Sequence, residues 1–185
     1  MAYKKVVFIH GNQTLHWSYA WVPWMVTELR KLNIEVVAET MPDSIIARQK
    51  YWITFLEDVA KVDDQTILVG HSSGALCAMR YAENHTILGS VLIGAAYQHH
   101  EDSLEIQSGY YDAPWEWDQI KKNQQWIVQF ASVDDPYIPI KDMRHVQQRL
   151  ATEYHEYTDR GHFFENQNEF HELLDSIKKK IVLTS

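Results

Sequence analysis

The stretch Thr66-Ile67-Leu68-Val69-Gly70-His71-Ser72-Ser73-Gly74-Ala75-Leu76 decides the fold of this chain. Its first four residues are β-branched or apolar and end at a glycine, which is typical of a buried strand. The pattern Gly-x-Ser-x-Gly follows, and small or apolar residues continue at helical spacing. The stretch therefore predicts a strand, a very sharp turn at Ser72 and a helix that starts directly after it.

The two glycines of this pattern have a steric reason. A serine at the tip of such a turn adopts a strained backbone conformation, and side chains at positions 70 and 74 would collide across the turn. The helix then begins beneath the serine, so its free N–H groups face an oxygen on which negative charge can develop. This is the arrangement of a nucleophile elbow, for which an ordinary strand-to-helix turn is the alternative interpretation.

Composition limits the class of protein. A length of 185 residues with 45% hydrophobic residues predicts one domain, 1–185, with a sizeable core. The net charge of −8 argues against nucleic acids and anionic membranes as partners. The single cysteine, Cys77, excludes an internal disulfide and fits a reducing compartment. The first apolar run starts too early for a signal peptide, and none is long enough to span a membrane, so we expect a cytoplasmic protein.

Strand and helix patterns alternate along the whole chain. Strands are expected at 6–9, 34–38, 66–70, 90–93, 126–130 and 154–158, and helices at 21–32, 46–62, 73–81, 139–150 and 166–180. The last helix is expected to start at Asn166, because Glu169 stands at capping-box spacing from it. The alternation predicts an α/β fold, a doubly wound parallel sheet of about six strands in the order 2-1-3-4-5-6. Ligand chemistry is then expected at the carboxyl ends of the strands.

The candidate catalytic residues all lie at such strand ends. A serine becomes nucleophilic only when a base takes its proton, and an anion must orient that base. After Ser72 in the chain, the acid is expected to be Asp134 or Asp135, and the base His162. Pro136 disfavours the α region for Asp135 and holds it extended, which can fix its carboxylate across the strand end.

Two further features complete the expected site. The backbone N–H groups of Asn12 and Ser73 are the candidates for an oxyanion hole. The aromatic segment after the fourth strand supplies Tyr110, Trp115 and Trp117 as candidates for a pocket wall, with core packing as the alternative. The run His99-His100-Glu101-Asp102 is interpreted as a solvated loop, so we expect no metal and no cofactor.

The chain resembles a known family, the small α/β-hydrolases of the retinoblastoma-binding serine hydrolase family. The residues that carry the resemblance are Gly11-Asn12, Met41-Pro42-Asp43, Gly70-His71-Ser72-Ser73-Gly74, Met79-Arg80-Tyr81-Ala82-Glu83, Ser108-Gly109-Tyr110, Pro114-Trp115, Asp134-Asp135-Pro136 and Gly161-His162-Phe163. The resemblance implies a compact α/β-hydrolase fold without a large cap and a triad of Ser72, Asp135 and His162.

One departure from the family concerns its partner protein. The name-giving interaction is attributed to a Leu-x-Cys-x-Glu motif, whereas Ala75 stands two residues before the only cysteine. Binding to a retinoblastoma-type partner is therefore not expected.

The sequence thus favours a metal-independent serine hydrolase of small carboxylic esters or amides that works through an acyl-enzyme. A non-catalytic binding protein on a hydrolase fold is the first alternative, although binding alone would not require the serine, aspartate and histidine in this order. A flavodoxin-like nucleotide binder is the second, and it lacks a Gly-rich phosphate loop after the first strand.

Overall fold

A single parallel sheet organises the computed structural model, which describes residues 4–165 and 167–183. The sheet contains β1 (Lys5–Ile9), β2 (Glu35–Ala38), β3 (Thr66–His71), β4 (Gly89–Ile93), β5 (Trp126–Ser132) and β6 (Glu153–Tyr157). Its strand order is β2-β1-β3-β4-β5-β6, and all neighbouring strands are parallel. The predicted order is therefore confirmed.

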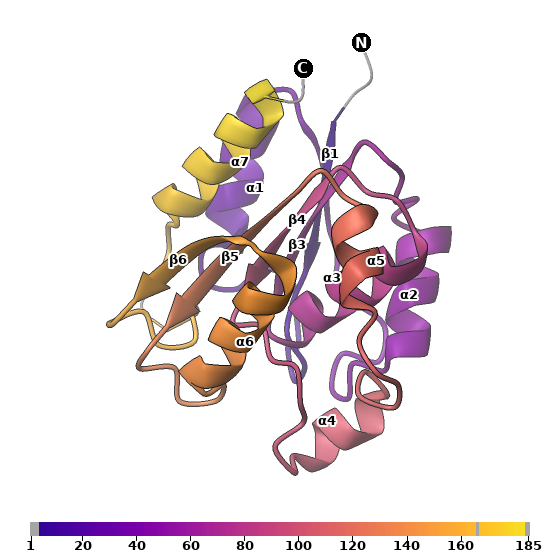
Figure 1. Cartoon of the computed structure of the whole chain (residues 1–185). Coiled ribbons are helices and arrows are strands. Elements are labelled where there is room, and N and C mark those ends of the chain that lie inside the picture. Colours follow the sequence, from indigo (N-terminus) through magenta and orange to yellow (C-terminus); the bar gives the residue numbers. More distant parts are fainter. Residues whose placement is uncertain (1–3, 166, 184–185) are drawn as a thin grey trace.

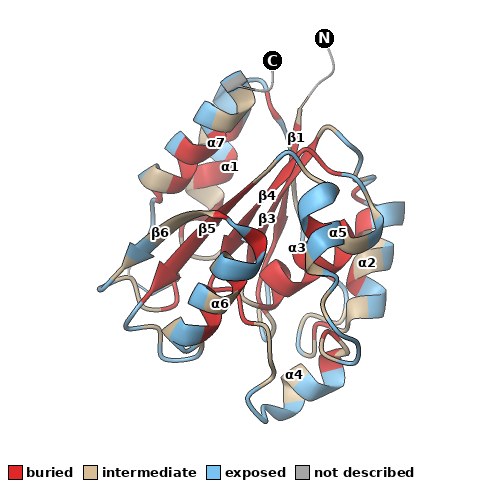
Figure 2. Cartoon of the chain, viewed as in Figure 1, coloured by how far each residue is buried: buried red, intermediate tan, exposed pale blue. Residues whose placement is uncertain are grey.

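Helices cover both faces of this sheet (Figure 1). One face carries α1 (Val22–Lys31) and α7 (His171–Leu183), and the other carries α2 (Gln49–Asp58), α3 (Ser73–Asn84), α5 (Trp117–Lys122) and α6 (Ile140–Leu150). Alternate residues of β1 enter two separate hydrophobic cores, Val6 and Phe8 on the α1 side and Val7 and Ile9 on the α3 side. The central strands β1, β3, β4 and β5 are accordingly buried on both faces, whereas the edge strands β2 and β6 are partly exposed (Figure 2).

The segment between β4 and β5 carries only short helices. Besides α5 it forms α4 (Ser103–Ser108), which lies beyond the carboxyl ends of the strands, outside the two helical layers (Figure 1). Each of these helices has six residues, which is too short to give repeated apolar positions in the sequence. The sequence of this segment therefore has no helical periodicity, and the segment forms no large cap, as expected.

Two predicted helix starts are wrong. The second helix begins at Gln49, not at 46, because a turn that includes the positive φ of Ala47 precedes it. The last helix begins at His171; the expected cap Asn166 lies outside the described residues. Phe170 instead packs fully buried before the helix, and its carbonyl accepts a hydrogen bond from the Leu174 N–H at 3.2 Å.

The turn at Ser72 has the strained geometry that the pattern predicts. Ser72 has φ 56° and ψ −123°, a conformation that L-residues rarely adopt. A β-carbon at Gly70 would lie 2.3 Å from the Gly74 carbonyl oxygen, and one at Gly74 would lie 2.0 Å from that of Ile9. The glycines therefore let the start of α3 touch the end of β1.

Within the described residues, no helix is both long and apolar enough to cross a membrane.

We predict that Gly74→Ala lowers the free energy of unfolding by about 3 kcal/mol, because its methyl group would meet two backbone carbonyls that cannot move independently. Urea unfolding measures the change. Gly161→Ala is the matched control: it has open space around it and a φ of 51°, so only the left-handed backbone penalty of about 1–2 kcal/mol applies. Equal losses in the two variants would contradict the steric account.

Candidate active site

The ends of β3 and β4 bring Ser72 and His162 to the same edge of the sheet. The Ser72 N–H donates a hydrogen bond of 2.9 Å to the carbonyl of Ile93, the last residue of β4. The next residue, Gly94, faces the imidazole, since a β-carbon there would lie 3.1 Å from His162 Cε1. A side chain at this position would therefore crowd the histidine, which explains the glycine.

His162 is oriented by Asp135. Its Nδ1 lies 2.7 Å from Asp135 Oδ2, and because a carboxylate oxygen only accepts, Nδ1 carries the proton and Nε2 is left with its lone pair. The other carboxylate oxygen, Oδ1, accepts hydrogen bonds from the backbone N–H groups of Tyr137 and Ile138, both at 2.9 Å. The Asp135 side chain has no exposed surface. Three hydrogen bonds thus fix a carboxylate that water does not reach.

Asp134 has a different set of partners. Its Oδ1 accepts hydrogen bonds from Ser132 Oγ at 2.5 Å and from the Gly161 N–H at 2.9 Å. These bonds, that from Ser132 above all, hold the pKa of the exposed Asp134 below its usual value. Asp134 therefore ties the end of β5 to the loop that carries His162, whereas Asp135 contacts the imidazole itself.

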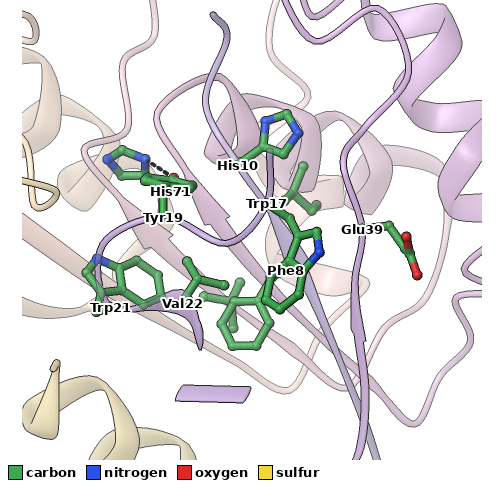
Figure 3. A pocket seen from close by; sticks show the side chains of 10 residues that line it. Phe8, His10, Trp17, Tyr19, Trp21, Val22, Glu39 and His71 are labelled. Carbon is green, nitrogen blue, oxygen red and sulfur yellow. Dashed lines mark hydrogen bonds between the residues drawn. The ribbon is translucent and has the colours of Figure 1, made fainter. Parts of the chain in front are cut away.

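A second buried histidine lies behind the first. His71 Nε2 donates to the His162 carbonyl oxygen at 2.7 Å, and its Nδ1 accepts from the Tyr19 hydroxyl at 2.8 Å (Figure 3). Burial, reinforced by the nearby His162, lowers the pKa of His71 to about 3. His71 is therefore a neutral support for the backbone of the His162 loop.

The same loop is also held from the side of α1. The indole N–H of Trp21 donates a hydrogen bond of 2.6 Å to the carbonyl oxygen of Phe163, and both side chains are fully buried. Phe163 has a positive φ of 61°. This contact fixes the chain direction immediately after His162.

His10, before the loop that follows β1, is a structural histidine as well. It accepts a hydrogen bond from the Met41 N–H at Nε2 (2.9 Å), so its Nδ1–H donates to the Gly11 carbonyl at 2.7 Å. Burial lowers its pKa, which keeps the ring neutral. The small cavity in Figure 3 is lined by His10, His71 and the aromatic residues of the loop after β1, and not by Ser72 or His162.

Asn12 and Ser73 lie next to each other, although they come from different elements. The Asn12 N–H points at Ser73 Oγ over a long distance of 3.4 Å. Both side chains also donate to one carboxyl oxygen, Glu105 Oε1, from Asn12 Nδ2 at 2.9 Å and from Ser73 Oγ at 2.8 Å. Sequence reasoning missed Glu105. The available signal was the spacing of Asp102 and Glu105, which predicts a helix start, and Asp102 indeed caps α4.

The three aromatic residues expected in the pocket wall pack against the core. Tyr110 is fully buried, and Trp115 and Trp117 lie half-buried against the same cluster. Arg80 holds this segment through hydrogen bonds to the carbonyl oxygens of residues 110, 113 and 114, and its guanidinium lies 3.8 Å from the Trp115 ring centre. Tyr110 has no surface with which to contact a substrate, and a pocket role for the tryptophans stays a prediction.

The histidine run at 99–100 does not form a cluster of metal ligands. His100 Nε2 lies 2.6 Å from the buried carboxylate of Asp142. Over residues 4–165 and 167–183, no group of three or more histidine, cysteine, aspartate or glutamate side chains is placed to hold a metal ion.

This sheet order, with a serine at the strained turn after β3 and a histidine after β6, defines an α/β hydrolase. The model of the family described as Serine hydrolase matches residues 6–181, and the chain belongs to this family. The rat protein named Serine hydrolase RBBP9 is 40% identical over 165 residues, which cover 89% of this chain and 88% of the rat protein.

Solved structures show the same fold. The ydeN gene product of Bacillus subtilis superposes with a TM-score of 0.88 at 20% identity, covering 97% of this chain and 99% of that one. The Est1E structure from Butyrivibrio proteoclasticus, which was solved with ferulic acid bound, gives a TM-score of 0.73 at 13% identity, covering 97% and 88%.

We predict that His71 makes the protein less stable as the pH falls from about 6.5 to about 3. In this window the unfolded chain protonates the histidine and the folded chain does not, so unfolding takes up a proton. His71→Gln should remove about 1.4 kcal/mol per pH unit from the slope of unfolding free energy against pH. Urea unfolding at several pH values measures both slopes, and identical slopes would show that His71 is protonated in the folded state.

Proposed function

We propose that this serine hydrolase cleaves small carboxylic esters or amides through a triad of Ser72, His162 and Asp135. The observation that carries the proposal is the hydrogen bond from His162 Nδ1 to the buried Asp135, at the edge of the sheet where Ser72 stands on its strained turn. This bond leaves His162 Nε2 as the base of the site. Family membership supports the reaction class, and the substrate class is our inference.

The proposed first half-reaction forms an acyl-enzyme. His162 Nε2 takes the proton of Ser72 Oγ as this oxygen attacks the carbonyl carbon of the substrate. The carbonyl π electrons move to oxygen and give a tetrahedral oxyanion. When the carbonyl re-forms, the bond to the leaving group breaks, and His162 returns its proton to the departing alcohol or amine. Asp135 remains ionised and stabilises the imidazolium.

The second half-reaction repeats these steps with water. His162 takes a proton from the water as its oxygen attacks the acyl carbon, and the collapse of the second tetrahedral intermediate returns this proton to Ser72 Oγ. The products are a carboxylic acid and the free enzyme. Each cycle therefore consumes one water, and the histidine is neutral at its end.

The oxyanion is proposed to bind the backbone N–H groups of Asn12 and Ser73. Ser73 is the first residue of α3, so its N–H has no partner within the helix. Among the residues that the structure describes, the Asn12 N–H contacts only Ser73 Oγ, at 3.4 Å, and an oxyanion can replace this contact at little cost. Both donors lie at the helix end where the dipole favours negative charge.

The preference for small substrates follows from the segment between β4 and β5. It carries two helices of six residues each, which cannot form the large cover that encloses long acyl chains. We do not propose a retinoblastoma-type partner. The motif is absent, and Cys77 is fully buried, with a pKa that burial raises to about 12.

We expect a fluorophosphonate to label the protein at one site per chain. The reagent traps the serine that the base activates, so Ser72→Ala should abolish labelling. Ser18→Ala, which changes an exposed serine, is the control and should be labelled like the wild type. Intact-mass spectrometry measures the adduct. Labelling of the Ser72→Ala protein would show that another residue is the nucleophile.

We expect Asp135→Asn to lower kcat for a short p-nitrophenyl ester by about 10⁴-fold, because an amide cannot hold the productive tautomer of His162. Asp134→Asn should cost less than about tenfold, since an amide oxygen can still accept the hydrogen bonds from Ser132 and Gly161. Both variants are compared at equal thermal stability. If Asp134→Asn were the more damaged variant, the assignment of the acid would be wrong.

A further inference from the structure

A carboxyl group outside the triad contacts both residues of the proposed oxyanion hole. Glu105 lies on α4, more than thirty residues after α3 begins, and its Oε1 accepts hydrogen bonds from Asn12 Nδ2 and Ser73 Oγ at 2.9 and 2.8 Å. Asn12 belongs to the loop after β1 and Ser73 to the first turn of α3. One oxygen atom therefore joins three separate elements at the place where the oxyanion is expected.

These contacts are stronger constraints than surface hydrogen bonds. Glu105 Oε2 is buried and makes no hydrogen bond of ordinary length within residues 4–165 and 167–183, so the two bonds to Oε1 hold the carboxyl group. Moving Asn12 or Ser73 away would remove one of the two hydrogen bonds that Oε1 accepts in this partly buried site, which is costly. The side chains of Asn12 and Ser73 are thereby held at a fixed distance from each other. The backbone N–H groups of the same two residues are held with them.

The position of α4 depends on the same contacts. A helix of six residues is not stable on its own, and α4 lies outside the two helical layers. Asp102 caps its first turn by accepting from the N–H groups of residues 104 and 105, which directs the Glu105 side chain. The helix is thus built locally and joined to the site by its glutamate.

The charge of Glu105 has to be compatible with an oxyanion nearby. Burial raises the pKa of Glu105, and the hydrogen bond from Ser73 opposes this effect. Asp102 raises the pKa further, whereas the Tyr111 hydroxyl and His162 lower it. A carboxyl group that becomes neutral more readily than usual opposes a developing negative charge less, and the hydrogen bonds that Oε1 accepts do not require it to be ionised.

We propose that Glu105 is a positioning residue of the oxyanion hole: by accepting hydrogen bonds from Asn12 and Ser73, it fixes the distance between the two backbone donors. This inference rests on the proposed function. It assigns Glu105 no contact with the reacting atoms and no proton transfer. Its effect is on the transition state, in which the oxyanion is formed, and not on the binding of the ground-state ester.

The test compares variants of the full-length protein in the hydrolysis of p-nitrophenyl acetate. Glu105→Ala removes the acceptor and should lower kcat by about 10- to 100-fold with KM changed less than about threefold, since the donors are displaced and not deleted. Glu105→Gln keeps an oxygen acceptor and should restore kcat to within about threefold of the wild type. Gln107→Ala, on the exposed side of α4, is the matched control and should leave both constants unchanged.

A trifluoromethyl ketone that forms a tetrahedral adduct supplies a second readout. Its inhibition constant should rise in Glu105→Ala by the same factor by which kcat/KM falls, because the adduct places an oxyanion between the two donors. A loss of stability alone would not produce this parallel. Glu105→Leu, which fills the space without an acceptor, should behave like the alanine variant and replaces it if alanine fails to fold.

Three results would overturn the inference: an unchanged kcat in the alanine and leucine variants, a glutamine variant as impaired as the alanine one, or a fall in kcat with unchanged ketone inhibition. Failure of the proposed function is a separate outcome, because it would appear in the wild type as the absence of fluorophosphonate labelling. A wild type that is labelled, with Glu105 variants that retain full activity, would refute the positioning role alone.

Discussion

The close approach of α3 to the end of β1 determines the rest of the site. At Gly74 the helix backbone touches the carbonyl groups of Ile9 and His10, which is possible only without a β-carbon. The contact forces Ser72 into its strained conformation and brings the loop after β1 over the start of the helix. One contact between two backbones therefore places the proposed nucleophile and both proposed oxyanion donors. The hydrogen bonds of Glu105 to Asn12 and Ser73 act within this frame.

The His162 side of the site is held in a different way, by hydrogen bonds to one neutral histidine and two aspartates. His162 rests on the neutral His71, while Asp135 and Asp134 hold its ring and its loop. Two histidines this close would repel each other if both were protonated, with their ring centres 4.7 Å apart. Because burial keeps His71 neutral, a positive charge can form on His162 without an opposing charge behind it.

The sequence predicted the sheet and the elements at its edge because these depend on local patterns. The apolar run before Ser72 and the two glycines leave few alternatives, and the strand ends collect the polar residues. The choice between Asp134 and Asp135 needed more, because both follow the same strand and only the direction of each side chain separates them. The family resemblance pointed to Asp135. In the structure, the carboxylate of Asp135 is hydrogen-bonded to the imidazole of His162.

Glu105 shows the limit of such reasoning. It lies in a segment without apolar periodicity, and its partners are separated from it by 93 and 32 residues in the chain. No local pattern indicates that the glutamate of this short helix turns toward a distant strand end. The late start of α7 has a related cause, since the burial of Phe170 against Phe130 and Trp21 is a tertiary contact. Both features are set by packing and not by the residues next to them.

The way Arg80 holds the segment after α4 has a consequence for divergence among related enzymes. Its guanidinium donates hydrogen bonds to the main-chain oxygens of residues 110, 113 and 114, so the contact depends on the path of the backbone. It does not depend on the side chains of Ala113 and Pro114, which are exposed. Substitutions at Ala113 and Pro114 that keep this path leave the anchor intact. The surface at residues 113 and 114 can therefore change its chemistry over evolutionary time while the backbone anchored by Arg80 keeps its position.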